Sequence, residues 1–370
     1  MKGALRIGKL SGIGVFIHWT FIFILLYIAY NVTKAGGDIW AILRGEIFLL
    51  LLYVCVVLHE MGHALAARKY GVRTLHIVLY PIGGIASLER IPEKPFEEFV
   101  VAIAGPMVNV GIAMGLGLYL YLFAGPTSFE ESGSATLVTL LDTFDKFIFT
   151  LMWINIGLVG FNAIPAFPMD GGRVLRALLA MKIGRVKATQ IASVIGQVFA
   201  ILFVAYGFLT TPFQPFIVLI GIFVYIAAMG ENRMVYTESK LSGFKVRDAM
   251  RTKFITLNGT DSLNEAVRVL LASAEDSFIV LQENKPIGVL YRKNLMEAIK
   301  NEETTTIADI TVRKIPFLQA EQDIQEVFQF MQRSRIHILP VVDQSSQLVG
   351  VLDRRNLDDF IAVQDVTKTR

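Results

Sequence analysis

Charged residues are scarce in this chain, and cysteine is almost absent. Of the 370 residues, 18% are charged and 54% are hydrophobic. This balance is typical of an integral membrane protein that also carries a soluble part. The net charge is only +3, which gives no reason to expect nucleic acid as a partner. The one cysteine, Cys55, excludes an internal disulfide framework.

The apolar residues gather into runs long enough for membrane-spanning helices. We expect about six transmembrane helices, at residues 13–30, 47–67, 99–123, 147–167, 195–209 and 213–229. The first run follows Lys2, Arg6 and Lys9, and no small-residue cleavage site comes after it. It is therefore expected to stay in the protein as a span and not to be removed as a signal peptide.

Lysine and arginine are unevenly distributed between the connecting segments. The segments between spans two and three and between spans four and five hold Arg68, Lys69, Arg73, Arg90, Lys94, Arg173, Arg176, Lys182, Arg185 and Lys187. The segments on the other side hold Lys34, Arg44 and Lys146. Because basic loops stay on the cytoplasmic side, both termini are expected in the cytoplasm.

The second run contains the motif His59-Glu60-Met-Gly-His63. On a helix, residues four apart share one face, so His59 and His63 can hold one divalent ion, for which Zn²⁺ is the usual choice. In this arrangement the glutamate acts as a general base and not as a ligand. The alternative is a helix whose polar residues only meet polar partners, but ionisable groups at membrane depth are costly. Cys55, one turn earlier, is either a fourth ligand or a small packing residue, and packing is its more typical role.

The fourth run ends in Asn162-Ala-Ile-Pro-Ala-Phe-Pro-Met-Asp170-Gly171-Gly172. Asp170 offers a carboxylate at the cytoplasmic end of a second descending span, at the depth of the histidine pair. Two imidazoles and a carboxylate make a three-ligand zinc site with a position open to water. The alternative for Asp170 is a helix N-cap. Asn162 either joins helices by hydrogen bonds or assists the substrate near the metal.

These motifs, in this order in two spans, resemble the site-2 protease family of intramembrane zinc metalloproteases. The likeness is to members with a C-terminal pair of cystathionine-β-synthase (CBS) domains, and it covers essentially the whole chain. It implies that His59, His63 and Asp170 bind zinc. It also implies that Glu60 is the catalytic acid and base and that Asn162 positions the substrate. The substrates implied are single-span proteins in the lipid bilayer.

Two further segments fit this resemblance. Residues 80–92 contain glycine and have a proline near each end, which is typical of a turn or an edge strand. In the family this region resembles a membrane-embedded β-hairpin, in which Gly83 and Gly84 would help an edge to pair with an unwound substrate. Gly105-Pro106-Met-Val-Asn109 in span three is also family-like; its small residues allow close helix packing, and Asn109 is expected to be structural.

From Lys245 onward, short apolar strands alternate with amphipathic helices, as in soluble α/β units. The segment Ile287–Leu295 recurs as Val349–Leu357, which is an internal repeat. We therefore expect a polytopic α-helical membrane domain with a membrane β-hairpin, followed by a cytoplasmic α/β CBS pair. The expected parts are a protease domain at 1–230, a polar linker with little structure at 231–244, repeats at 245–302 and 303–363, and a tail at 364–370.

CBS pairs often bind adenine nucleotides, but this chain departs from the usual signature. The positions that commonly hold Thr or Ser and then Asp are Tyr291 and Asn294 in the first repeat, and Asp353 and Asn356 in the second. Asparagine is uncharged, so it accepts hydrogen bonds from ribose hydroxyls more weakly than aspartate does. Two roles stay open: a nucleotide site that uses Asp353, Asn294 and Asn356, or a structural or dimerising pair, which would allow a homodimer.

The expected function is hydrolysis of peptide bonds in or near the transmembrane segments of membrane-anchored regulatory proteins, with the CBS pair as a regulator. One alternative is a membrane zinc protease that cuts juxtamembrane or soluble segments. The other is a transporter regulated by CBS domains, which would need polar residues along a path across both leaflets.

Overall fold

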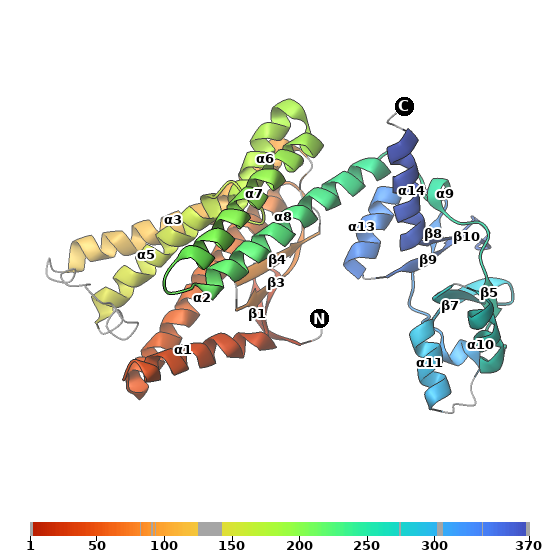
Figure 1. Ribbon diagram of the computed structural model, residues 1–370, viewed down its shortest axis with the longest axis horizontal. Helices are drawn as coiled ribbons and strands as arrows, with labels where there is room; N and C mark the ends of the chain where they lie inside the picture. The colour runs from red at the N-terminus through yellow and green to blue at the C-terminus, as the bar shows by residue number, and fades with distance from the viewer. Residues whose placement is uncertain are drawn as a thin grey trace. The chain divides into compact units, whose positions relative to one another are not determined.

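The computed structural model describes residues 3–81, 83–89, 92, 94–124, 143–273, 275–301, 306–334 and 336–367. The chain divides into two units, Met1–Val235 and Tyr236–Arg370, and each is considered on its own (Figure 1). Lys2, Arg90, part of the expected hairpin segment and the last three residues of the expected tail lie outside the described residues.

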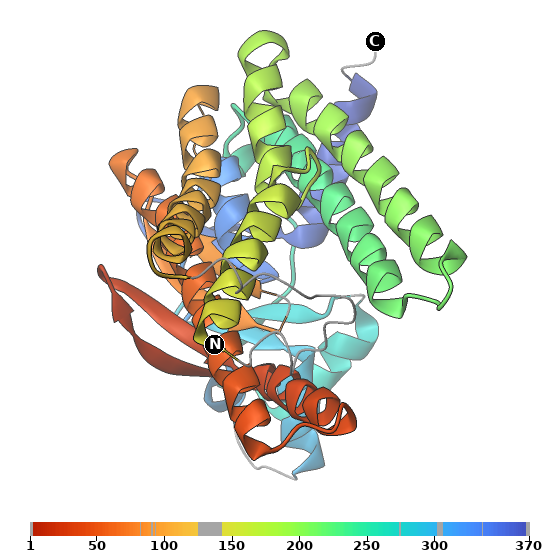
Figure 2. The same cartoon turned by 90° about the vertical axis from the view of Figure 1, so that its left-hand side faces the viewer.

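Long apolar helices dominate the first unit. Within the described ranges, five are long and apolar enough to cross a membrane: α2 (Ile39–Lys69), α3 (Pro95–Phe123), α5 (Phe144–Ala163), α7 (Arg185–Leu209) and α8 (Pro215–Leu241). The shorter helices of this unit are η1 (Trp19–Phe21), α1 (Ile22–Lys34) and α6 (Asp170–Ile183). Helix α3 packs against α2, α5 and α6 (Figure 2).

The first predicted span is wrong in its first half. Residues Ile13–His18 form strand β2, and the helix α1 that follows has 13 residues. At 1.5 Å per residue α1 is about 20 Å long, which is shorter than the roughly 30 Å hydrocarbon core. The apolar run could not reveal the strand, because one of its two partners, β3, lies far along the sequence and pairs with it only in the folded protein.

One four-stranded sheet accompanies these helices. It contains β1 (Ala4–Leu10), β2 (Ile13–His18), β3 (Thr74–Tyr80) and β4 (Gly83–Leu88), in that order. Strands β2 and β3 are parallel, and the other two pairs are antiparallel. Ile77 and Leu79 of β3 pack in one buried cluster with Tyr53 and Met61 of α2. The sheet therefore rests on α2, and β4 is one of its two edges.

The second unit repeats one arrangement twice. Its elements are α9 (Val246–Ala249), β5 (Thr256–Asn258), α10 (Leu263–Ala272), β6 (Ser277–Gln282), β7 (Lys285–Tyr291), α11 (Arg292–Lys300), α12 (Ile307–Ile310), β8 (Leu318–Gln319), α13 (Ile324–Ser334), β9 (Ile338–Val342), β10 (Leu348–Asp353) and α14 (Arg354–Thr367). They form the sheets β5-β6-β7 and β10-β9-β8. In each sheet the first two strands along the chain are parallel, and the last two are antiparallel.

The two repeats exchange their first segments. Val312, which follows α12 of the second repeat, bridges to Val289 of the first, and Arg251, which follows α9 of the first repeat, bridges to Val351 of the second. The contact is close: a Cβ on Gly288 would lie 2.4 Å from the carbonyl oxygen of Val312. Each repeat therefore completes the other, and neither has a finished core alone.

The linker expected to have little structure is mostly helical. Helix α8 continues to Leu241, whose side chain is fully buried in the core of the second unit. Its polar residues have partners: Glu231 pairs with Arg176, and Glu238 accepts a hydrogen bond from Gln329 at 3.0 Å. A polar stretch carries little helical signal of its own, and here these partners stabilise it.

Candidate metal centre

Two helices bring the predicted ligands together. On α2, His59 and His63 are one turn apart on one face. Helix α5 ends at Ala163, Pro165 and Pro168 disfavour a helix in the segment that follows, and α6 begins at Asp170. The N-cap of α6 is Met169, and the Asp170 carboxylate turns to the histidines instead of capping.

Three side-chain atoms converge at this point. The Nε2 atoms of His59 and His63 are each 3.1 Å from Oδ2 of Asp170, and they are 3.1 Å from each other. The residues are buried, with 8%, 4% and 7% of their surface exposed in the order His59, His63 and Asp170. Metal ions are usually held by three or more histidine, cysteine, aspartate or glutamate side chains. In the described part of the chain, these three residues are the one such group.

Helix α3 determines which ring nitrogens carry hydrogen. Nδ1 of His63 is 2.7 Å from the carbonyl oxygen of Val101, which can only accept. Nδ1 of His59 is 2.8 Å from Oδ1 of Asn109, and the amide nitrogen of Asn109 donates to Asn155 at 3.0 Å. Both Nδ1 atoms therefore donate, and the Nε2 atoms that face Asp170 are left to bind a cation. Three acceptors this close repel one another unless a cation lies between them.

The spacing fits zinc. Around a tetrahedral zinc ion with bonds of about 2.0–2.1 Å, ligand atoms lie roughly 3.3 Å apart. The three observed separations of 3.1 Å are close to that value. Two imidazoles and one carboxylate also leave a fourth position free, as a hydrolytic site requires. The residues present thus fit the ion by both geometry and donor type.

Comparison with known proteins agrees with this site. The chain matches the profile of peptidase family M50 over residues 47–206 and that of the CBS domain over residues 246–301 and 307–363. The zinc metalloprotease MJ0392 of Methanocaldococcus jannaschii is 30% identical over 358 residues, which are 96% of each chain. The chain belongs to peptidase family M50, the site-2 proteases.

Two further relatives resemble this site-2 protease. Stage IV sporulation protein FB of Bacillus subtilis is 28% identical over 263 residues, which are 70% of this chain and 85% of that one. The solved site-2 protease from Methanocaldococcus jannaschii has 37% sequence identity and a TM-score of 0.44, and it covers 62% of this chain and 95% of that one. The family confirms that the chain is a zinc metalloprotease of the membrane with a CBS pair, and the transporter alternative is wrong.

The other residues predicted for the protease site lie on α2, β4 and α5. Glu60 follows His59 on α2 and is not a member of the metal-holding group. Gly83 and Gly84 begin β4, and a Cβ on Gly84 would lie 3.2 Å from Cγ of Glu60. Asn162 lies at the end of α5, where its amide nitrogen donates to the carbonyl of Leu158 at 3.0 Å. The hairpin thus meets α2 beside Glu60.

Cys55 is a packing residue in this site-2 protease. It is buried in an apolar cluster with Phe48 and Leu151 and does not belong to the metal-holding group. Asn109, which the sequence interpretation expected to be only structural, is fully buried, accepts a hydrogen bond from His59 and donates one to Asn155. The signal available was an amide within an apolar span, which must find a partner there.

The CBS residues singled out from the sequence lie at matching places in the two repeats. Asn294 is in the first turn of α11, and Asn356 is in the first turn of α14. Asp353, at the end of β10, accepts hydrogen bonds from Arg251 at 3.2 Å and from the backbone of Asn356 at 2.8 Å. Hydrogen bonding to Glu275 raises the pKa of Arg251 above its ordinary value. The Asp353 carboxylate is therefore already engaged within the chain.

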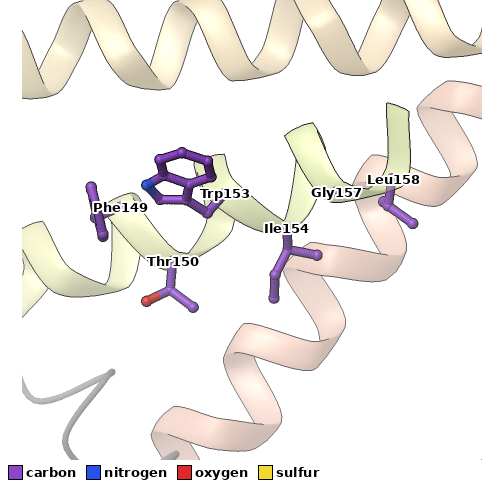
Figure 3. A pocket seen from close by; sticks show the side chains of 6 residues that line it. All are labelled: Phe149, Thr150, Trp153, Ile154, Gly157 and Leu158. Atoms are coloured by element: carbon purple, nitrogen blue, oxygen red, sulfur yellow. The ribbon is translucent and has the colours of Figure 1, made fainter. Parts of the chain in front are cut away.

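An open apolar pocket lies on α5, away from this chemistry. Its lining residues come from one helix, as Figure 3 shows: Phe149, Thr150, Trp153, Ile154, Gly157 and Leu158. None of these side chains is an acid, a base or a metal ligand, and 54% of Trp153 is exposed. This surface suits lipid and not catalysis.

Proposed function

We propose that this site-2 protease hydrolyses peptide bonds within or beside the transmembrane segments of membrane-anchored regulatory proteins. The observation that carries the proposal is the convergence of His59 and His63, on the candidate membrane-spanning helix α2, with Asp170. His63 and His59 precede Arg68 by five and nine residues on α2, which places them roughly 8 and 14 Å below the basic end of that helix. Cleavage there would reach a peptide inside the bilayer.

In this proposal His59, His63 and Asp170 hold zinc, which when bound acidifies water and polarises a carbonyl group. Glu60 takes the proton of the attacking water and returns it to the leaving amine. Asn162 would turn its amide from Leu158 toward the substrate, where it can donate to the oxygen that becomes negative. Asn109 and the Val101 carbonyl hold the two rings in place.

The substrate has to be unwound, because helical carbonyls are already hydrogen-bonded. Strand β4 is an edge strand, and among the described residues it pairs with β3 alone. A peptide added along its other side would be extended, and Gly84 lies against Glu60. We propose that β4 presents the scissile bond in this way.

The orientation proposed has both termini in the cytoplasm. Arg68, Lys69 and Arg73 cluster where α2 ends, and α6 and the start of α7 add further basic residues. Such clusters stay on the cytoplasmic side. The zinc site would then be nearer the cytoplasmic face.

The CBS pair is proposed to regulate the protease, through an adenine nucleotide or through a homodimer. Helix α8 runs without a break into the second unit, and its Glu231 pairs with the buried Arg176 of α6. Helix α6 begins at Asp170. A movement of α8 would therefore act on α6 through the ion pair between Glu231 and Arg176, and so on Asp170 at the start of α6.

The test uses the full chain in liposomes with a single-span substrate. Glu60→Gln should keep zinc and lose cleavage, whereas Glu46→Gln, another half-buried glutamate on α2, should keep both. Cleavage retained in Glu60→Gln would remove Glu60 from the chemistry. Mass spectrometry of the products locates the cut: a site within the span supports the proposal, and cuts confined to soluble segments support the alternative protease.

A further inference from the structure

Tyr53 makes a second connection between α2 and the β3–β4 hairpin. Its hydroxyl group donates to the carbonyl oxygens of Tyr80, at 2.7 Å, and Pro81, at 2.9 Å. Only 6% of Tyr53 is exposed, and its ring meets that of Phe21 edge-on, with the centroids 4.7 Å apart. A phenol has one hydrogen to donate, so the two carbonyls share it.

These carbonyls lie where β3 ends. Tyr80 is the last residue of β3, and Pro81 follows it, outside both strands. The Pro81 carbonyl is therefore not part of the strand ladder, and within a membrane protein water is not freely available to replace a missing bond. The Tyr53 hydroxyl group thus satisfies this carbonyl and fixes the end of β3.

Tyr53, which binds the end of β3, and Glu60 lie on the same face of α2. Tyr53 and Glu60 are seven residues apart on α2, which is about two turns, or roughly 10 Å. Between them, a Cβ on Gly84 would lie 2.9 Å from Cγ1 of Val56. The hairpin thus touches α2 at two heights, by hydrogen bonds at Tyr53 and by close packing at Gly84.

We infer that Tyr53 is a positioning residue that aligns the free edge of β4 with Glu60 and so selects the peptide bond that is cut. This inference rests on the proposed pairing of the substrate with β4. Carbonyl groups that point the same way along an extended peptide are two residues apart. Without the hydrogen bonds from Tyr53, the substrate strand can shift along β4. Peptide bonds two residues from the normal one can then reach Glu60.

The test is Tyr53→Phe, which keeps the ring against Phe21 and removes only the hydroxyl group. With the substrate in liposomes, kcat/KM should fall about tenfold, as expected for the loss of one buried hydrogen-bond donor. Additional cuts should appear two residues from the wild-type position, and zinc content should stay at the wild-type value. The unfolding temperature should fall by only a few degrees, because the two carbonyl groups lose their donor. Tyr30→Phe, an exposed tyrosine on α1, is the matched control and should cut as the wild type does.

Two results would overturn the inference. One is a single, wild-type cut at the wild-type rate in Tyr53→Phe. The other is a loss of activity that accompanies a loss of zinc or unfolding at the assay temperature, because that would make Tyr53 merely structural. The proposed proteolysis is judged separately, by comparing the wild type with Glu60→Gln; equal activity there would overturn both ideas.

Discussion

Gly105 of α3 makes room for the imidazole ring of His63 on α2. A Cβ on residue 105 would lie 2.2 Å from Nε2 of His63 and 2.5 Å from its Cε1. The ring cannot move aside without breaking the bond from its Nδ1 to the Val101 carbonyl. The absence of one methyl group on α3 is therefore a requirement of the metal centre.

The first prediction follows from this contact. Gly105→Ala should displace His63, lower bound zinc to well below one ion per chain and reduce proteolysis by at least about a hundredfold, as expected for a lost ligand contact. Metal analysis of the purified protein and a cleavage assay measure the two effects. Gly111→Ala on the same helix is the control, because a Cβ there would meet nothing within 4 Å. Full zinc occupancy in Gly105→Ala would contradict the prediction.

A second prediction concerns the partner of His59. Asn109→Ala removes the acceptor that orients the ring, so zinc affinity should fall about 10–100-fold, the usual effect of such a partner. Competition with a zinc chelator measures this affinity. Asn31→Ala on α1, whose amide bonds a backbone carbonyl, should leave it unchanged. Equal affinities in the two variants would mean that Asn109 only packs.

The buried charge of Arg176 leads to a third prediction. Its side chain is fully buried and pairs with Glu98 of α3, which is 3% exposed, and with Glu231 of α8. Arg176→Met would leave Glu98 buried without its partner, so the free energy of unfolding should fall by roughly 3–5 kcal/mol. Denaturant unfolding in detergent measures it, and Arg176→Met/Glu98→Met should recover part of the loss.

The matched control for this loss is an exposed pair. Lys94→Met breaks the ion pair between Lys94, whose side chain is 81% exposed, and Glu97. It should cost less than about 1 kcal/mol, because water screens surface pairs. Similar losses in Lys94→Met and Arg176→Met would show that burial of the pair has no energetic importance.

A fourth prediction tests the exchange of segments in the CBS pair. Gly288→Val would collide with the carbonyl group of Val312, so the second unit should unfold at a lower temperature. Backbone collisions of this kind typically cost at least about 1–3 kcal/mol. Gln282→Val, at an exposed strand position of the same sheet, should have little effect. Calorimetry of the full chain compares the unfolding temperatures of the two variants. An unchanged unfolding temperature in Gly288→Val would contradict the exchange of segments between the repeats.

The amino-acid sequence by itself determined the features that depend on residues close together in the chain. The pairing of His59 with His63 follows from helix periodicity, and the repeat of residues 287–295 at 349–357 is visible without coordinates. The family motif also selected Asp170, which the structure brings to the two rings. The helical form of residues 231–241 and the strand at residues 13–18 were missed. Distant residues contribute to both, since Arg176 and Gln329 bind the helix and β3 pairs with the strand.

Only the tertiary structure decided how the site is held. Asn109, Gly105 and the Val101 carbonyl act on the histidines from a different helix, and Tyr53 reaches the end of β3, 27 residues away. Residues on one helix keep fixed spacings whatever surrounds them, so periodicity reveals them. Contacts between helices and strands depend on how whole elements pack, and that packing is settled by side-chain volume and hydrogen bonding throughout the core.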